Sequence, residues 1–123
     1  MDYKSFIWIF LGGGLGSCLR YLITVYAKAI NVLFPWGTLV ANLLGCFLIG
    51  LLMGYFSKWN IAKEEVYLLF IVGFCGGLTT FSSFTLDLVN LSKGGEILYP
   101  LLYFMANILF GILILLAGLF LAR

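Results

Sequence analysis

The chain of 123 residues has no histidine, only two prolines and few charged side chains. Lys and Arg total 7 and Asp and Glu total 5, so 10% of the residues are charged, whereas soluble domains carry roughly 25%. A net charge of +2 without a cluster of basic residues excludes a nucleic-acid surface, so we expect no nucleic-acid partner. Because no nucleophile has a general base within plausible reach, an enzyme is not expected either.

The spacing of the cysteines also gives no sign of disulfide or metal chemistry. The three cysteines, Cys18, Cys46 and Cys75, all lie in apolar segments and form no Cys-x-x-Cys or Cys/His arrangement. An odd number of cysteines without such spacing predicts neither a disulfide framework nor a zinc site. We interpret these cysteines as small side chains that pack inside the protein.

Apolar residues, by contrast, are abundant. They make up 63% of the chain, and the mean hydropathy is +1.14. A helix that crosses a bilayer needs about 20 apolar residues, so the length allows four spans and no sizeable soluble domain. We predict an all-α integral membrane protein that forms one domain over residues 1–123, with helices at about 5–29, 35–56, 64–90 and 97–122. Pro35 suits the first turn of the second helix.

Loop charges give little preference for one orientation in the membrane. The basic residues of one side of the predicted bundle are Lys4, Lys58, Lys63 and Arg123, and those of the other side are Lys28 and Lys93. Under the positive-inside rule this is a weak bias, which Glu64 and Glu65 partly offset. A short chain with so little bias can insert both ways, which permits an antiparallel homodimer.

A polar interruption in the third predicted span is the most informative segment. Residues 73–84 read GFCGGLTTFSSF, with three glycines and four hydroxyl residues between apolar flanks. Irregular backbone survives at bilayer depth only when it is buried in protein or lines a polar cavity. Broken helices of this kind mark ion and substrate sites in transport proteins. We therefore expect a broken third helix and a functional site beside it.

Two further polar residues lie inside the first and second spans, and each has two interpretations. Arg20 either snorkels to an interface or faces an aqueous vestibule, where its charge would concentrate anions. Asn42 either hydrogen-bonds between helices or donates its amide N–H groups to an anion in a pore. Asp87, the only carboxylate well inside an apolar span, either contacts another helix or reaches the interface.

Periodic spacing adds a second group of candidates. Tyr103, Asn107 and Gly111 are four residues apart, so they share one face of the fourth helix, either as a polar track or as a plain helix contact. Phe81 and Phe84 are three residues apart just after the interruption. They are either core residues or aromatic edges that face an anion, since the ring edge carries positive potential. Ser82 and Ser83 add hydroxyl donors beside them.

Three motifs in the same order resemble the CrcB/Fluc family of fluoride ion channels over nearly the whole chain. They are Gly12-Gly13-x-x-Gly16-x-x-x-Arg20-Tyr21, then Gly37-Thr38-Leu39-x-x-Asn42-x-x-Gly45-x-Phe47-x-x-Gly50, and then the whole segment from Gly73 to Phe84. The resemblance implies a dual-topology, antiparallel homodimer of four-helix subunits with two fluoride pores. It also implies that the chain passively exports cytoplasmic fluoride through the inner membrane of a bacterium.

The resemblance also implies roles for individual residues. A structural sodium ion (Na+) at the dimer centre would be held by the backbone carbonyls of Gly76 and Thr79, at the point where the broken helices cross. Phe81 and Phe84 correspond to the family's paired pore phenylalanines. The other pore residues would be Asn42, Ser82, Ser83, Tyr103 and Asn107, and Arg20 would line the vestibule. The interruption thus divides into a backbone part, residues 73–80, and a side-chain part, residues 81–84.

The chain departs from the family pattern at Ser83, Asp87 and Gly111, where threonine, glutamate and, in some relatives, serine are found. The alternative function is a small drug/proton antiporter, which also has four spans. Its exchange chemistry needs a Glu embedded in the first span, and this chain has none there. Glycines four residues apart, which allow close approach between helices in lipid, occur as three pairs: Gly12 and Gly16, Gly50 and Gly54, and Gly73 and Gly77. A non-transporting scaffold would explain these pairs but not a hydroxyl-rich break followed by paired phenylalanines.

Overall fold

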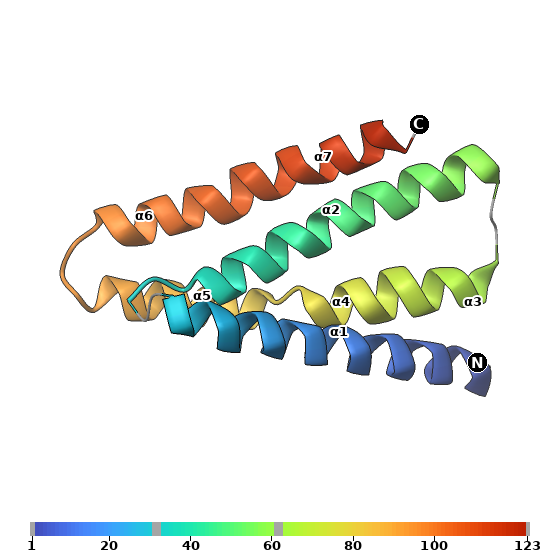
Figure 1. Ribbon diagram of the computed structural model, residues 1–123, viewed down its shortest axis with the longest axis horizontal. Helices are drawn as coiled ribbons and strands as arrows, with labels where there is room; N and C mark the ends of the chain where they lie inside the picture. The colour runs from blue at the N-terminus through green and yellow to red at the C-terminus, as the bar shows by residue number, and fades with distance from the viewer. Residues whose placement is uncertain (1, 31–32, 61–62, 123) are drawn as a thin grey trace.

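Four long helical segments run side by side in the computed structural model, which describes residues 2–30, 33–60 and 63–122 (Figure 1). The first two are α1 (Tyr3–Ile30) and α2 (Trp36–Trp59). The third comprises α3 (Glu64–Tyr67), η1 (Leu68–Cys75), α4 (Gly76–Leu78) and α5 (Phe81–Ser92). The fourth comprises α6 (Leu98–Met105), η2 (Ala106–Phe110) and α7 (Gly111–Leu121). Across the described ranges there is no strand, so the fold is all-helical as predicted.

The helix ends differ from the predicted bounds by a few residues. α1 starts earlier, at Tyr3, and α2 continues to Trp59 because no residue breaks the helix before Asn60, which adopts a left-handed conformation with φ 49°. The placement of Pro35 in the first turn of α2 was wrong. Pro35 precedes the helix with φ −80° and ψ 60°, because the Trp36 N–H donates to the Phe34 carbonyl in a tight γ-turn.

The four segments pack mainly as two pairs, α1 against η1 and α4, and α2 against α7. Small residues allow this close approach. A Cβ atom on Gly16 would overlap the Phe74 carbonyl oxygen, and one on Gly50 would overlap the Leu115 carbonyl oxygen. Both glycines had been interpreted as helix-contact positions, and the packing agrees with that interpretation. The bundle is therefore held together by backbone contacts that a larger residue would disrupt.

The third segment is interrupted as predicted, but over a shorter stretch. The chain stays helical through Leu78 and is extended at Thr79 (φ −82°, ψ 154°) and Thr80 (φ −152°, ψ 122°) before α5 begins. The glycines of residues 73–77 are themselves helical, and Gly73 and Gly77 serve close packing against α1 and not a change of direction. The π-helix η1, a rare geometry that is frequent at functional sites, precedes α4 and the break.

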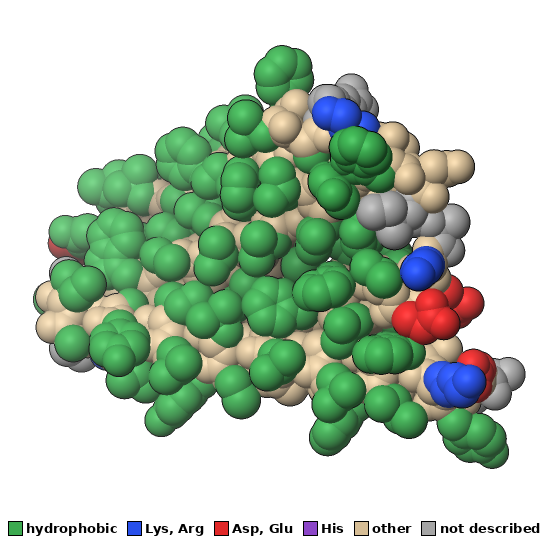
Figure 2. Space-filling view, turned by 45° about the vertical axis from the view of Figure 1, so that its right-hand side comes forward, with side chains coloured by type: hydrophobic (Ala, Val, Ile, Leu, Met, Phe, Trp, Pro, Cys, Tyr) green, Lys and Arg blue, Asp and Glu red, His purple; other side chains and the backbone are tan. Residues whose placement is uncertain are grey.

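The surface is that of a membrane protein. Each of the four segments is long and apolar enough to cross a bilayer, with mean hydropathy from 1.5 to 2.5. Hydrophobic side chains cover the long face of the molecule in Figure 2, and the charged side chains in that view gather mainly at one end. The start of α1 and the end of α7 lie at the same end of the bundle (Figure 1). The chain is a multi-pass integral membrane protein.

Candidate functional site

The break in the third segment is bridged by the side chain of Asn42, which lies in the first third of α2. Its Oδ1 accepts a hydrogen bond from the Thr80 N–H at 2.8 Å. Its Nδ2 donates to the Thr80 carbonyl at 3.4 Å. One amide thus satisfies the Thr80 N–H, which has lost its helical acceptor, and adds a contact to the Thr80 carbonyl. This geometry holds α2 against the point where the chain becomes extended.

Asn42 also contacts the fourth segment. Its Nδ2 lies 3.0 Å from the Oδ1 of Asn107, and the Asn107 Nδ2 donates to the Tyr103 carbonyl one turn earlier, also at 3.0 Å. Asn107 belongs to the π-helix η2. The structure therefore brings together Asn42, Asn107 and the broken helix, which are far apart in the sequence.

Hydroxyl groups gather at the start of α5. The Thr80 Oγ1 accepts from the Ser83 N–H at 3.2 Å, which caps the helix. The same oxygen lies 3.0 Å from the Ser82 Oγ and 3.3 Å from the Ser83 Oγ. Ser82 and Ser83 thus lie beside Thr80, a residue that the sequence analysis did not place among the site side chains.

The two phenylalanines form a pair but occupy different environments. The ring centroids of Phe81 and Phe84 are 5.8 Å apart, with the planes inclined at 45°. Phe84 is buried, and its centroid lies 5.5 Å from that of Tyr103. Phe81, in contrast, is 75% exposed on the single subunit, although it lies near the middle of its span. The structure therefore assigns Phe84 to the core cluster and leaves Phe81 on the surface.

A cavity of about 270 Å³ lies beside the break. Its lining includes four of the predicted pore residues together with Cys46, Thr79 and Thr80; the four are Asn42, Phe81, Phe84 and Asn107. Ser82, Ser83 and Tyr103 are not among its lining residues. Cys46 follows Asn42 by one helical turn, so the cavity continues along the same face of α2. Four of the predicted pore residues therefore gather around one space.

A second polar group extends from Tyr103 toward the connection between α1 and α2. The Asp87 Oδ2 accepts hydrogen bonds from the Thr38 hydroxyl at 2.6 Å and from the Tyr103 hydroxyl at 3.1 Å. Tyr103 is fully buried and Thr38 is 8% exposed. Of the two interpretations of Asp87, a contact between helices is the one observed. Its Thr38 partner could not have been inferred from spacing, because the residues are 49 positions apart.

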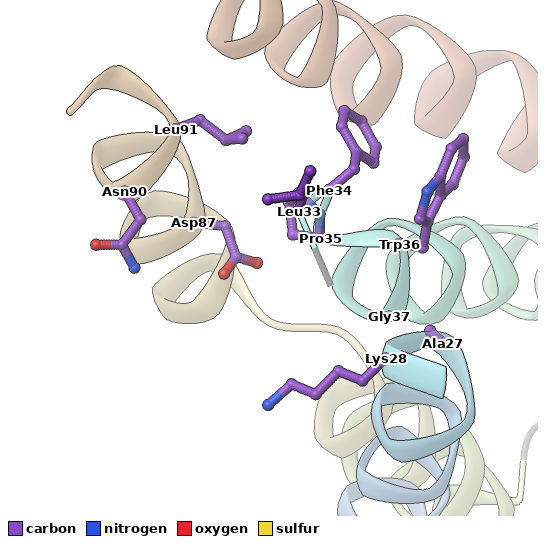
Figure 3. Close-up of a pocket in the computed structure, with 10 residues that line it drawn as sticks. All are labelled: Ala27, Lys28, Leu33, Phe34, Pro35, Trp36, Gly37, Asp87, Asn90 and Leu91. Carbon is purple, nitrogen blue, oxygen red and sulfur yellow. The ribbon is translucent and has the colours of Figure 1, made fainter. Parts of the chain in front are cut away.

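Asp87 also lines a cavity of about 250 Å³ at this end of the bundle (Figure 3). Lys28 near the end of α1 and Asn90 on α5 line the same cavity, as do residues of the connection such as Phe34. A hydrogen-bonded chain therefore leads from a cavity with a lysine, through Asp87 and Tyr103, toward Asn107 and Asn42.

Arg20 on α1 is half-buried and hydrogen-bonded to backbone at the break. Its Nε–H donates to the Gly77 carbonyl at 3.0 Å, and the Ser17 Oγ approaches the same oxygen at 3.4 Å. Both sequence interpretations of Arg20, snorkelling and a vestibule, missed this contact. The sequence carries no signal for this contact, because the two residues are 57 positions apart and meet only through the packing of α1 against the third segment.

The carbonyls of Gly76 and Thr79 differ from that of Gly77, because no donor in the described part of the chain reaches them. The helical partner of Gly76 would be the Thr80 N–H, which donates to Asn42 instead. The helical partner of Thr79 would be the Ser83 N–H, which donates to the Thr80 hydroxyl. Unpartnered carbonyl oxygens suit a hard cation. No cluster of His, Cys, Asp or Glu side chains that suits a metal occurs among the described residues.

Comparisons with known proteins agree with this architecture. A family model described as CrcB-like protein, Camphor Resistance (CrcB), matches residues 7–119. The chain belongs to this CrcB family. The protein of Flavobacterium psychrophilum named Fluoride-specific ion channel FluC is 41% identical to it over 121 residues, which cover 98% of each chain.

Two further relatives carry the same printed name. The Chlorobium phaeobacteroides protein is 40% identical over 121 residues, which cover 98% of this chain and 94% of its own. The Phocaeicola vulgatus protein is 42% identical over 124 residues, which cover 98% of this chain and 99% of its own. The resemblance stated from the three motifs is confirmed. The name of these relatives is that of a channel and not of an enzyme, and their bacterial hosts point to the plasma membrane.

Proposed function

We propose that this chain is a fluoride-selective channel through which fluoride leaves the cytoplasm passively. The single observation that carries the proposal is the polar chain through the apolar bundle, from Asp87 and Tyr103 to Asn107, Asn42 and the hydroxyl cluster at Thr80. The name of the CrcB relatives, fluoride-specific ion channel, supports fluoride as the ion.

The chemistry of the lining residues fits a small, strongly hydrated anion. Such an ion enters a narrow path only if hydrogen-bond donors replace its water. Asn42 and Asn107 supply amide N–H groups, and the Thr80 cluster supplies hydroxyls, all without a fixed positive charge that would trap the ion. Phe81 and Phe84, which line the same cavity, add ring edges of positive potential.

The roles of the pore residues follow from this arrangement. Asn42 is the central donor, because it touches both the break and Asn107. Tyr103 orients Asn107 through its carbonyl and is itself held by Asp87. Ser82 and Ser83 extend the hydroxyl path beyond Thr80. The cavity with Lys28 is the mouth, where the ammonium group raises the local anion concentration.

We further propose that two copies form an antiparallel homodimer with two pores. Gly76 and Phe81 are exposed on the single subunit at the middle of a membrane span. Lipid offers no donor or cation to the freed carbonyls of the break, so this surface needs a protein partner. A second copy inserted in the opposite orientation would cover both breaks at once, and the weak charge bias of the loops is compatible with such insertion.

At the centre of that dimer, the Gly76 and Thr79 carbonyls of both copies would hold a structural sodium ion. These oxygens have no donor among the described residues, so the donor set fits a hard monovalent cation. The bound ion would offset the negative potential of the freed carbonyl groups. The Asn42 and Thr80 side chains keep these carbonyls free, because they accept hydrogen bonds from the N–H groups of Thr80 and Ser83 that would otherwise bond to them.

Purified protein reconstituted into liposomes tests the channel proposal. Liposomes loaded with potassium fluoride and treated with a potassium carrier should release fluoride quickly, whereas protein-free liposomes should retain it. Release at the protein-free rate would contradict a channel.

A further inference from the structure

The carbonyl of Gly77 is treated differently from the other carbonyls of the break. It receives a charged donor from another helix, the Arg20 Nε–H at 3.0 Å, and a hydroxyl contact from Ser17 at 3.4 Å. Gly76 and Thr79, on either side of it, receive no donor from the described residues. One carbonyl oxygen between the two candidate ligands in the sequence is therefore already bonded to a fixed positive charge.

This pattern is not required by the helix break alone. A guanidinium inside a span costs roughly 2.5–3.5 kcal/mol on insertion scales, and a neutral serine is already in reach of the same oxygen. Helix packing does not explain the arginine either, because Gly12 and Gly16 provide the close contacts of α1 with η1 and α4. The guanidinium charge itself is the feature that needs an explanation.

We propose that Arg20 is a positioning residue. By bonding the Gly77 carbonyl it keeps that oxygen from binding the cation, and its positive charge makes the site prefer monovalent over divalent cations. The inference rests on the proposed sodium site of the preceding subsection. With Gly77 bonded to Arg20, its oxygen is not free to bind the cation, and the oxygens of Gly76 and Thr79 remain as the proposed ligands of each subunit. The charged guanidinium lies against the Gly77 oxygen, which stands between them in the sequence.

Two consequences follow from Coulomb's law. A fixed positive charge beside the site weakens the binding of every cation, and it weakens the binding of a divalent cation twice as much as that of a monovalent one. Arg20 therefore selects a monovalent ion and keeps its affinity moderate. Without the charge, the freed Gly77 oxygen would join the site, and calcium would become a competitive ligand.

The test measures thermal unfolding of the detergent-purified full chain against the concentration of sodium or calcium chloride, at constant ionic strength with choline chloride. A cation that binds the folded protein raises its melting temperature in a concentration-dependent way. The variants are Arg20→Met, which keeps an apolar stem without charge, Arg20→Gln, and Arg20→Lys, which keeps the charge. Ser17→Ala is the matched control, because it removes the other contact to Gly77 without changing the charge.

We expect both neutral variants to reach half of the sodium-dependent stabilisation at a concentration roughly tenfold lower than wild type, as removal of a nearby unit charge predicts. Both should also be stabilised by calcium, whereas wild type, Arg20→Lys and Ser17→Ala should not. A merely structural arginine predicts a lower melting temperature at every salt concentration, with the sodium midpoint unchanged.

The inference is overturned if the neutral variants keep the wild-type sodium midpoint or show no response to calcium. Should neither neutral variant fold, Arg20→Lys decides, because calcium stabilisation of that charged variant would also contradict the proposal. A wild-type melting temperature that does not depend on sodium would contradict the proposed cation site and therefore this inference as well. Fluoride release from liposomes is measured separately, so failure of the channel proposal is distinguishable from failure of this one.

Discussion

The Asn42 amide occupies the gap in the third helical segment, accepting from the Thr80 N–H at 2.8 Å and donating to the Asn107 Oδ1 at 3.0 Å. An asparagine in a membrane helix can serve either as a contact between helices or as a pore donor, and the sequence left both interpretations open. The structure explains why both can hold for one residue. Its oxygen accepts from the Thr80 N–H at the break, and the residue also lines the adjacent cavity.

Replacement of Asn42 by alanine should strongly reduce fluoride efflux. Hydrogen bonds to a charged group are worth about 1.5–3 kcal/mol, so the loss of one donor predicts a reduction of at least about tenfold. Efflux from proteoliposomes checks this, with Leu44→Ala on the lipid-exposed side of the same helix as control. Equal efflux rates for the two variants would remove Asn42 from the path.

Phe81→Ile should lower fluoride efflux by roughly fivefold, because the substitution keeps apolar volume but removes the positive ring edge. The matched control is Phe120→Ile, since Phe120 on α7 is 79% exposed and Phe81 is 75% exposed. Size-exclusion chromatography establishes whether the oligomeric state is unchanged. If both variants conduct like wild type, Phe81 is a surface residue without a role in conduction.

Asp87→Leu should destabilise the protein by about 1–3 kcal/mol, because the buried Tyr103 and Thr38 hydroxyls lose their shared acceptor. Asp87→Asn keeps an acceptor oxygen and should cost less. Equilibrium unfolding in detergent measures both, with Asn90→Leu, an exposed position on the same helix, as control. Equal stability of Asp87→Leu and wild type would show that the hydrogen bonds of Asp87 with Thr38 and Tyr103 do not stabilise the fold.

Gly16→Ala should cost about 1–3 kcal/mol of stability by overpacking, because its Cβ would overlap the Phe74 carbonyl oxygen. Gly14→Ala, two residues earlier, has open space around the added atom and should be neutral or slightly stabilising. The same unfolding measurement compares the two. A Gly14→Ala variant as unstable as Gly16→Ala would contradict the described packing of α1.

Much of the fold could be predicted from hydropathy alone, because span length and turn residues are local properties. The four spans, the broken third helix and the glycine contact positions follow from the run lengths and from the small-residue spacing. Pro35 was misplaced because the γ-turn that precedes α2 depends on how Phe34 and Trp36 meet, which proline propensity does not specify. The break is shorter than its composition indicates because Gly73 and Gly77 serve packing against α1.

The candidate site was predictable in its residue types but not in its contacts. Asn42, Asn107 and Phe81 were found from polar or aromatic residues placed inside apolar spans, and they line one cavity. The Asp87–Thr38 and Arg20–Gly77 contacts join residues that are 49 and 57 positions apart. Such pairs depend on how the helices are rotated against one another, and no local pattern in one sequence encodes that rotation.

The most direct test of the central claim compares fluoride and chloride in the same proteoliposomes. Vesicles loaded with equal concentrations of potassium fluoride and potassium chloride are diluted into an impermeant salt, a potassium carrier is added, and two ion-selective electrodes follow both anions. The account predicts rapid release of fluoride, while chloride is released no faster than from protein-free vesicles. Equal release of the two anions, or release of neither, would contradict it.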